Sequence, residues 1–156
     1  MPAKQLTDTE TRQYLADNDT GRLATCGPDG QPYIVPLNYI FHKGSIYFHC
    51  AHEGKKLDNI KAAPQVCFEV SHTDKLYFAD KPCNCGTRYT SVLVFGTASI
   101  VEDEAEKIDV LNTLTAQFAK GRPYPYIDGK LAASCSVVRI NINELSGKKN
   151  VDPALV

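Results

Sequence analysis

Apolar and polar residues alternate along several short stretches of this chain. Every second position of the stretch 33–42 is apolar: Tyr33, Val35, Leu37, Tyr39 and Phe41. A period of two places such side chains on one face of an extended strand. We therefore expect a strand over 33–42 whose apolar face packs into the core.

Similar stretches, separated by turn residues, predict an antiparallel sheet. The expected strands are 21–26, 33–42, 45–50, 66–70, 89–102 and 134–142. Glycine-containing turns at 27–30 and 43–44 suit hairpins, and six strands joined in this way favour a small antiparallel barrel over a parallel sheet. Residues 73–87 are rich in turn formers and are expected to be irregular. Gly96, inside a strand, is expected at a bulge or a close backbone approach.

Three helices are expected outside the barrel. Thr7 and Glu10 have the spacing of a capping box at the start of the first helix. The second covers 54–63 and is stopped by a proline, and the third begins near Asp103. The inner face expected for the third helix is Ile108, Leu111, Leu114, Thr115 and Phe118. The chain is therefore expected to be mainly β with flanking helices.

Length and charge narrow the class of protein. A chain of 156 residues suits one hydrophobic core, so residues 1–156 are expected to form a single domain. A formal net charge of −1 lacks the basic excess that non-specific nucleic-acid binding needs. No stretch has the roughly 20 apolar residues of a membrane span, and the start of the chain lacks a signal-peptide core. We expect a cytoplasmic protein that binds neither nucleic acid nor a membrane.

The chain has six cysteines. Because the cytoplasm is a reducing compartment, we expect them to stay mostly as thiols. Cys26, Cys50, Cys67 and Cys135 lie within strand-like apolar stretches. A thiol in such a place behaves as a small hydrophobe. These four cysteines are expected to serve packing.

A lysine pair marks the most informative segment. Gly54, Lys55 and Lys56 fall in the first turn of the second expected helix. That turn has unpaired N–H groups and the positive end of the helix dipole, which the lysines oppose. A bound phosphate would offset this arrangement, using the backbone N–H groups and both ammonium groups. The alternative is a solvated pair at an exposed helix end.

Two further features suit a flat ligand. Pro36 cannot donate to a sheet ladder, so its strand is expected at an edge, where neighbouring backbone groups are free to bind a ring such as isoalloxazine. A protected edge strand is the plainer interpretation. Arg88, Tyr89 and Ser91 gather polar donors at the start of another strand, where they could bind a phosphate or a ribityl chain. They could equally hold the preceding loop.

Six short motifs follow one another between about Thr20 and Gly96. They are Gly21-Arg-Leu-Ala-Thr25, Gly30-Gln-Pro-Tyr-Ile-Val-Pro-Leu-Asn-Tyr39, Ile46-Tyr-Phe-His49, Glu53-Gly-Lys-Lys-Leu-Asp-Asn-Ile60, Val66-Cys-Phe-Glu-Val70 and Arg88-Tyr-Thr-Ser-Val92. Their order and spacing resemble those of the pyridoxamine 5′-phosphate oxidase-like FMN-binding split-barrel superfamily. Within it, the chain is most similar to the nitroimidazole-resistance (Nim-type) branch.

The resemblance implies a six-stranded antiparallel split β-barrel and a homodimer with FMN at its interface. Lys55 and Lys56 match the basic pair that holds the FMN phosphate. Val35, Pro36, Leu37 and Asn38 match the strand whose backbone lines the isoalloxazine, and Ser91 falls where the family places a polar cofactor contact. His52 lies just before the phosphate motif. With Arg88 and Tyr89, these residues are the expected cofactor contacts. Ile34 and Tyr39 stand where pyridoxamine phosphate oxidases carry an arginine and a lysine, which favours a nitroreductase-like protein over vitamin B6 oxidation.

The function expected from this resemblance is a flavin-dependent reductase. Reduced FMN would pass a hydride to a small electron-poor substrate such as a nitroaromatic or a quinone, and NAD(P)H could reduce the flavin first. The chain has no Gly-x-Gly-x-x-Gly sequence, so a nicotinamide would bind only transiently. His52, His49 and Tyr89 are the candidate proton donors.

Two other functions stay open at this point. One is a non-catalytic protein that binds a flavin or haem without turnover. The other is a zinc-binding module that uses His49, His52, Cys83 and Cys85, which are ligand types that zinc prefers. Their spacing is not the usual pair of Cys-x-x-Cys arms, so a metal site is the weaker hypothesis.

Overall fold

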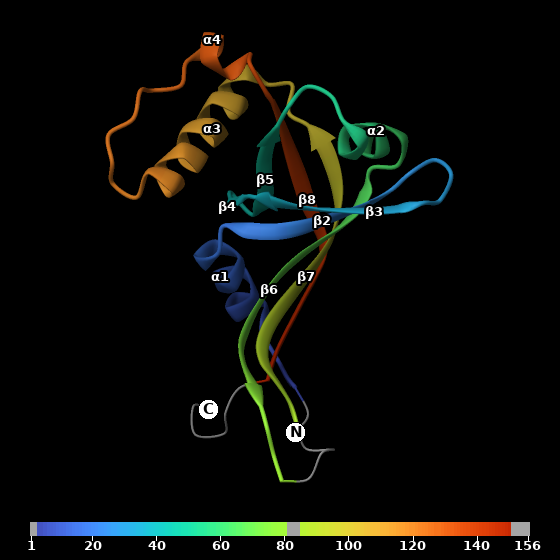
Figure 1. Cartoon of the computed structure of the whole chain (residues 1–156). Helices are drawn as coiled ribbons and strands as arrows, with labels where there is room; N and C mark the ends of the chain where they lie inside the picture. The colour runs from blue at the N-terminus through green and yellow to red at the C-terminus, as the bar shows by residue number, and fades with distance from the viewer. Residues whose placement is uncertain (1–2, 81–84, 151–156) are drawn as a thin grey trace.

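A curled antiparallel sheet forms most of the molecule (Figure 1). The structure is a computed structural model in which residues 3–80 and 85–150 are described. The strands are β1 Lys4–Gln5, β2 Thr20–Cys26, β3 Pro32–Asn38, β4 Ile40–His42, β5 Ser45–Cys50, β6 Gln65–Tyr77, β7 Gly86–Ile100 and β8 Ser136–Asn150. The helices are α1 Asp8–Asp17, α2 Lys55–Ala62, α3 Glu104–Ala119 and α4 Gly129–Ala132.

The sheet has eight strands in the order β3-β2-β6-β7-β8-β5-β4, with the two-residue β1 paired to β8. Every pair is antiparallel. The expected mainly β, antiparallel fold with flanking helices is therefore confirmed. The count is eight instead of the expected six, because the short β1 is added and the strand expected over 33–42 is divided in two. Two segments differ from the expectation.

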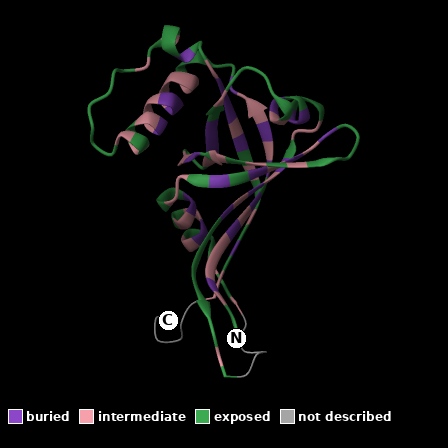
Figure 2. Ribbon diagram, viewed as in Figure 1, coloured by how far each residue is buried: buried purple, intermediate pink, exposed green. Residues whose placement is uncertain are grey.

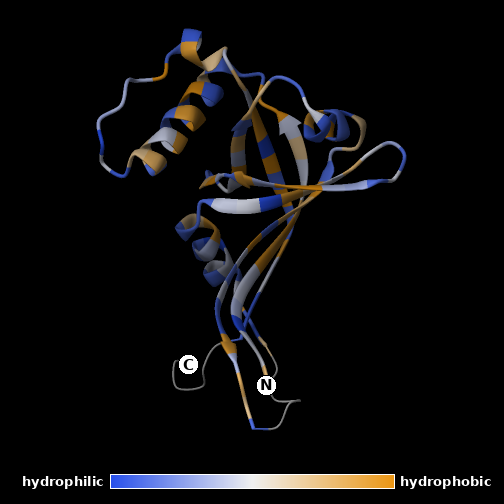
Figure 3. Cartoon of the chain, viewed as in Figure 1, coloured by the Kyte–Doolittle hydropathy of each residue, from blue (hydrophilic) through white to orange (hydrophobic). Residues whose placement is uncertain are grey.

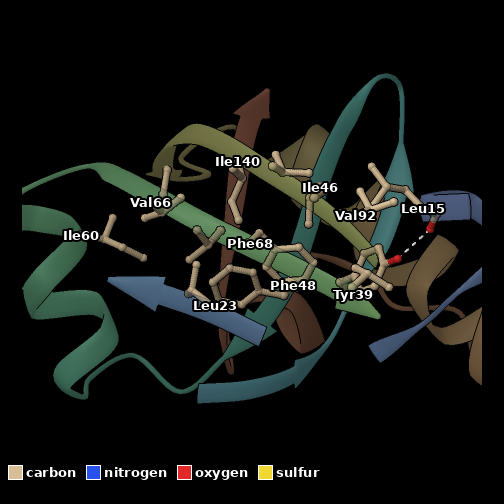
Figure 4. Close-up of a cluster of buried hydrophobic side chains, with 14 of the residues drawn as sticks. Leu15, Leu23, Tyr39, Ile46, Phe48, Ile60, Val66, Phe68, Val92 and Ile140 are labelled. Carbon is tan, nitrogen blue, oxygen red and sulfur yellow. Dashed lines mark hydrogen bonds between the residues drawn. The ribbon is translucent and has the colours of Figure 1, made fainter. Parts of the chain in front are cut away.

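The first difference is a break at Tyr39, which divides the strand expected over 33–42 into β3 and β4. Tyr39 is fully buried, and its phenol donates to the Leu15 carbonyl oxygen at 2.8 Å (Figure 4). Its backbone N–H donates to Asp19, and its carbonyl oxygen accepts from the Gln117 side chain. Because these bonds replace the ladder, the strand bends there, and Ile40 becomes buried against a different layer.

The second difference is an extension of the β6–β7 hairpin through residues that were expected to be irregular. Pairing continues to Tyr77 and Gly86, with a register shift between Thr73 and Lys75. We call residues 71–77 of β6 and 86–91 of β7 the arm. Residues 71–78 are all exposed, so the arm projects beyond the core (Figure 2). The expectation of irregular structure is therefore wrong for 73–77 and 86–87, where cross-strand pairing overrides local propensity, and is confirmed for 78–80 and 85.

Two clusters of buried side chains form the core. The larger lies inside the curled sheet and includes Leu23, Phe48 and Phe68 (Figure 4). The smaller lies between the sheet and α3 and includes Val110 and Leu114. Cys50 packs against the first cluster and Cys135 against the second, as expected for packing thiols.

The helix ends largely follow the sequence. Thr7 and Glu10 form the expected capping box at α1, and the Asp103 side chain caps α3. The short α4 was not foreseen, and Phe118, expected on the inner face of α3, is 38% exposed.

Among the described residues, no helix has both the length and the apolar character to cross a bilayer.

Candidate functional site

The first turn of α2 is open and carries two lysines, Lys55 and Lys56, together with one acidic residue, Asp58. Gly54 precedes the helix with a φ of +130°, and no atom lies within 4 Å of the position that a Cβ would take there. No side chain of the described residues caps this helix, whereas side chains of Thr7, Asp103 and Asp128 cap α1, α3 and α4. The end of α2 thus presents backbone N–H groups in an unobstructed position.

The two lysines of this turn point to different neighbours. The Lys55 ammonium lies 5.4 Å from the centre of the Tyr33 ring, which brings it over β3. Lys56 is half-buried near Cys50: burial raises the pKa of the Cys50 thiol, and the Lys56 charge partly offsets this effect. Figure 3 shows α2 as a mainly hydrophilic helix. The structure therefore gathers two cations and the open helix end beside the edge strand β3.

His52 fixes the loop that leads into this turn. Its Nε2 lies 3.0 Å from the Ala133 carbonyl oxygen, and its Nδ1 lies 3.0 Å from the Ser136 hydroxyl. A carbonyl oxygen only accepts, so Nε2 donates to it, and in the neutral ring Nδ1 accepts from the Ser136 hydroxyl. Both ring nitrogens are therefore used inside the protomer, and His52 acts as a positioning residue.

The strand that carries Pro36 is an edge strand, as expected, because β3 ends the strand order. Val35 and Leu37 pack against the larger core cluster, while Pro36 and Asn38 are exposed. The Asn38 side chain donates to Thr20 Oγ1 at 3.2 Å. A ligand on this edge would therefore meet backbone groups of 35–38 and the exposed Pro36 ring.

The remaining predicted contacts lie on β7, towards the arm. Arg88 is buried and donates to the Asn150 side chain at 3.0 Å, and its guanidinium lies 4.7 Å from the centre of the Tyr77 ring. Lys148 on β8 lies 6.0 Å from the Tyr89 ring centre. Ser91 and Lys148 line a hollow of about 200 Å³. Arg88 thus links β7 to β8 and to Tyr77 of the preceding segment 73–87, which agrees with the interpretation that this cluster holds the preceding loop.

Within one protomer the predicted contacts form two separate groups. Pro36 of β3 is in line with Leu93 of β7, two residues from Ser91, through the pairs Pro36–Arg22, Arg22–Glu69 and Glu69–Leu93. Strands β2 and β6 therefore lie between the two groups, which at about 4.8 Å per strand separates them by roughly 14 Å. The first group contains β3, Lys55 and Lys56, and the second contains Arg88, Tyr89 and Ser91.

The described members of the proposed zinc-ligand set do not come together in one place. His52 contacts Ala133 and Ser136, whereas the Cys85 thiol contacts Ala79 beyond the other end of β7. Cys83 lies outside the described residues. Residues 3–80 and 85–150 contain no group of three or more His, Cys, Asp or Glu side chains that could hold a metal ion.

Two cavities flank β5 and β8, and sequence reasoning missed both. His49 opens into one of about 300 Å³, together with Leu114, Ile127 and Cys135. The other, of about 370 Å³, adjoins His52. Its lining residues are His52, Ile100, Val101, Glu102, Glu104, Lys107, Gly129, Ala132, Ala133 and Ser136. Because four separate segments supply these walls, no local motif marks the cavity.

Solved structures share this fold. An FAD-binding protein from Mesorhizobium loti is 27% identical, with a TM-score of 0.73 over 97% of this chain and 100% of that one. A candidate 5-nitroimidazole antibiotic resistance protein from Bacteroides thetaiotaomicron is 20% identical, with a TM-score of 0.79 over 95% and 89%. An FAD- and haem-binding protein from Mycobacterium smegmatis is 20% identical, with a TM-score of 0.84 over 96% and 74%. The last two likenesses establish the fold alone.

Sequence comparison identifies the family. An uncharacterized protein of Rhizobium meliloti is 32% identical over 71 residues, which span about half of that protein (46%) and 46% of this chain. The model of the pyridoxamine 5′-phosphate oxidase family matches residues 7–149, which include the barrel and the open turn of α2. On that match, the chain belongs to the pyridoxamine 5′-phosphate oxidase family.

Proposed function

We propose that this protein binds a flavin and holds the phosphate of its FMN portion at the first turn of α2. The observation that carries the proposal is the uncapped helix end with Gly54, Lys55 and Lys56 beside β3. Backbone N–H groups and two ammonium groups are the donor set that a phosphate dianion prefers. The FAD-binding M. loti protein, at 27% identity, supports a flavin as the ligand class.

The isoalloxazine ring would lie along the edge strand β3. Its pyrimidine side carries donors and acceptors that can pair with backbone groups of residues 35–38. Val35 and Leu37 pack into the core, which holds this part of the strand in place. His52 fixes the loop before Lys55 through two hydrogen bonds, so the phosphate end of the site is pre-organised.

We further propose a homodimer, because one protomer separates the two groups of predicted contacts. An apolar row crosses the outer face of the sheet through directly paired positions: Ile34, Ala24, Cys67 and Phe95. At the two ends of this row, Ile34 is 63% exposed and Phe95 is 44% exposed. Large apolar side chains exposed on one face of a sheet suit a contact with another protein. A second copy packed on this row would cover it. The partner's Tyr89 and the partner's Ser91 could then face the β3 edge.

The proposed reaction is a reduction of a small electron-poor substrate of the nitroaromatic or quinone type. A bound flavin supplies hydride transfer, and NAD(P)H serves as the electron donor. Lys55 and Lys56 hold the phosphate, and β3 orients the ring. Tyr89 is the favoured proton donor, because His52 uses both ring nitrogens internally and His49 opens into a separate cavity.

Flavin titration tests the binding proposal. Replacing Lys55 or Lys56 with alanine removes one charged hydrogen-bond donor, so we expect each variant to weaken FMN binding by about 10- to 100-fold. Lys61→Ala, at an exposed position in the last turn of α2, is the matched control and should bind like the original protein. An unchanged affinity for FMN in the double variant Lys55→Ala/Lys56→Ala would contradict the proposal.

Anaerobic mixing with NADH or NADPH tests the reductase step. We expect the flavin absorbance near the visible maximum to bleach and then to return when a nitroaromatic or a quinone is added. A protein that keeps its flavin oxidised with both nicotinamides would instead be a flavin-binding protein without this activity.

A further inference from the structure

We infer that the hollow beside Lys148 binds a carboxylate group of the electron acceptor, so that the protein prefers negatively charged nitroaromatics to neutral ones. This acceptor class rests on the proposed flavin site, homodimer and reductase activity, and it deepens them. The hollow has a volume of about 200 Å³. Complete small-molecule sites have roughly 300–1,000 Å³, so the hollow suits one end of a ligand.

A row of polar side chains crosses the hollow on the outer face of the sheet. Lys148 of β8 is paired directly with Gln5 of β1 and with Ser91 of β7. Ser146 also lines the hollow and lies two residues along β8, on the same face. Together these side chains offer an ammonium, a carboxamide and two hydroxyl groups, all of which donate hydrogen bonds. Such a set of donors suits an oxygen anion.

Lys148 gives the hollow a positive charge that no carboxylate of the described residues neutralises. Its ammonium lies 6.0 Å from the centre of the Tyr89 ring, and within the described part of the chain it forms no ion pair. The next lysine, Lys149, instead lies 3.7 Å from the Glu10 carboxylate. A single ammonium matches the single charge of a carboxylate, whereas the two lysines of α2 suit a phosphate dianion.

The hollow belongs to the group of predicted contacts that one protomer keeps apart from β3. Ser91 lines it, and Lys148 is the direct neighbour of Ser91 in the sheet. In the proposed dimer, the partner's Ser91 faces the β3 edge, so the partner's Lys148 lies there as well. An acceptor whose carboxylate is bound at this ammonium would therefore have its ring beside the flavin.

The backbone that carries Lys148 is held from two sides. The Leu6 N–H donates to the Gly147 carbonyl oxygen at 2.8 Å, which fastens β1 to β8 beside the hollow. A Cβ at Gly147 would lie 2.8 Å from Thr11 Oγ1, so β8 packs directly against α1 here. The donors of the hollow are therefore arranged before a ligand binds.

Titration of the FMN-loaded protein with 4-nitrobenzoate and with 4-nitrobenzamide, without an electron donor, tests this acceptor class. The two compounds share the ring and the nitro group and differ in the carboxylate. We expect 4-nitrobenzoate to bind about 10-fold more tightly, the low end for one charged hydrogen bond. The preference should shrink at high salt, which screens exposed charges.

The outcomes of these titrations separate the two proposals. If FMN binds but 4-nitrobenzoate and 4-nitrobenzamide bind equally, the carboxylate site is wrong while the flavin site stands. A protein that takes up no FMN contradicts the proposed function. A preference for 4-nitrobenzoate in that protein would still support the carboxylate site, and equal binding would overturn it.

A lysine variant locates the site. Lys148→Met removes the charge and keeps the length of the side chain, so we expect it to abolish the preference and to leave FMN and 4-nitrobenzamide binding unchanged. In turnover it should raise the KM for 4-nitrobenzoate with an unchanged kcat. Lys148→Arg should keep the preference. Lys149→Met, the adjacent lysine beside α1, is the matched control and should behave like the original protein. A preference that survives Lys148→Met would overturn the assignment.

A variant at Ser146 tests the same hollow without touching the lysine. Ser146 is exposed, so Ser146→Asp adds a negative charge to the lining without disturbing the core. We expect it to weaken 4-nitrobenzoate binding by about 3-fold, as for one exposed charge pair, and to leave 4-nitrobenzamide binding unchanged. Ser146→Asn is the uncharged control of the same size. Equal losses for both compounds in Ser146→Asp would contradict a carboxylate site.

Discussion

Gly96 is a single residue whose sequence position already predicted its structural role. It lies at a register shift between β7 and β8, next to Phe95. A Cβ at position 96 would lie 2.6 Å from Ile140 Cγ2 and would also collide with the Asn141 carbonyl oxygen. The expected bulge and close backbone approach are therefore both confirmed. Glycine is needed here because the neighbouring strand occupies the space of any side chain.

Gly96→Ala should therefore destabilise the protein by about 1–3 kcal/mol, the usual cost of overpacking a buried position. Gly86→Ala on the same strand is the control, since no atom lies within 4 Å of its Cβ position. Chemical denaturation monitored by circular dichroism measures both variants. Equal stability of the two would contradict the close approach at Gly96.

At the scale of elements, an ion-pair group helps to fix α3 against β4 and its turn. The Asp109 carboxylate lies 2.8 Å from the Lys43 ammonium and 2.9 Å from His42 Nε2. Hydrogen bonds from Lys43 and His42 hold the pKa of the Asp109 carboxyl below its usual value of 3.8. Since folding lowers this pKa, the contribution to stability exists above pH 4 and is lost as the pH falls through the lowered value.

Asp109→Asn should lower the free energy of unfolding at pH 7 by about 0.5–1 kcal/mol, a small effect because solvent screens these half-exposed groups. The difference from the original protein should shrink below pH 4, where the native carboxyl also becomes neutral. Denaturation at a series of pH values measures this dependence. Glu144→Gln, at an exposed position on β8, serves as the control. A difference that grows towards low pH would contradict the assignment.

At the scale of the whole molecule, the apolar row on the outer sheet face bears on assembly. Phe95 lies on β7 at one end of this row and on the same face as Leu93 and Ser91. A dimer formed over the row would bury both exposed ends, Ile34 and Phe95, and would place the arm of one protomer beside the partner. Assembly and cofactor binding should therefore depend on one another.

Phe95→Glu should convert the proposed dimer into monomers, because a carboxylate would be desolvated in the apolar interface. Sedimentation velocity measures the change in mass, and flavin titration should show weaker binding in the same variant. Phe118→Glu, on α3, is the matched control and should stay dimeric. A dimer that survives Phe95→Glu would place the interface on another face.

Much of this architecture followed from local pattern. The alternation of apolar residues identified most strands, because a strand buried on one face repeats every two residues. Capping residues located α1 and α3. The pair Lys55 and Lys56 after Gly54 predicted a charged helix start, and the structure places it there without a side-chain cap. Each of these features depends on residues that are close together in the sequence.

What the tertiary structure decided depends on contacts between distant segments. The bend at Tyr39 follows from hydrogen bonds to Leu15, Asp19 and Gln117, none of which its own alternating pattern could indicate. The sequence determined most of the strands, the double-lysine start of α2 and the family resemblance. Only folding decided that Arg88, Tyr89 and Ser91 lie apart from that turn in one protomer, and that a cavity forms beside His52. The physical reason is that the local pattern of apolar residues determines which face of each strand or helix is buried. Pairing between distant segments determines which elements pack against each other.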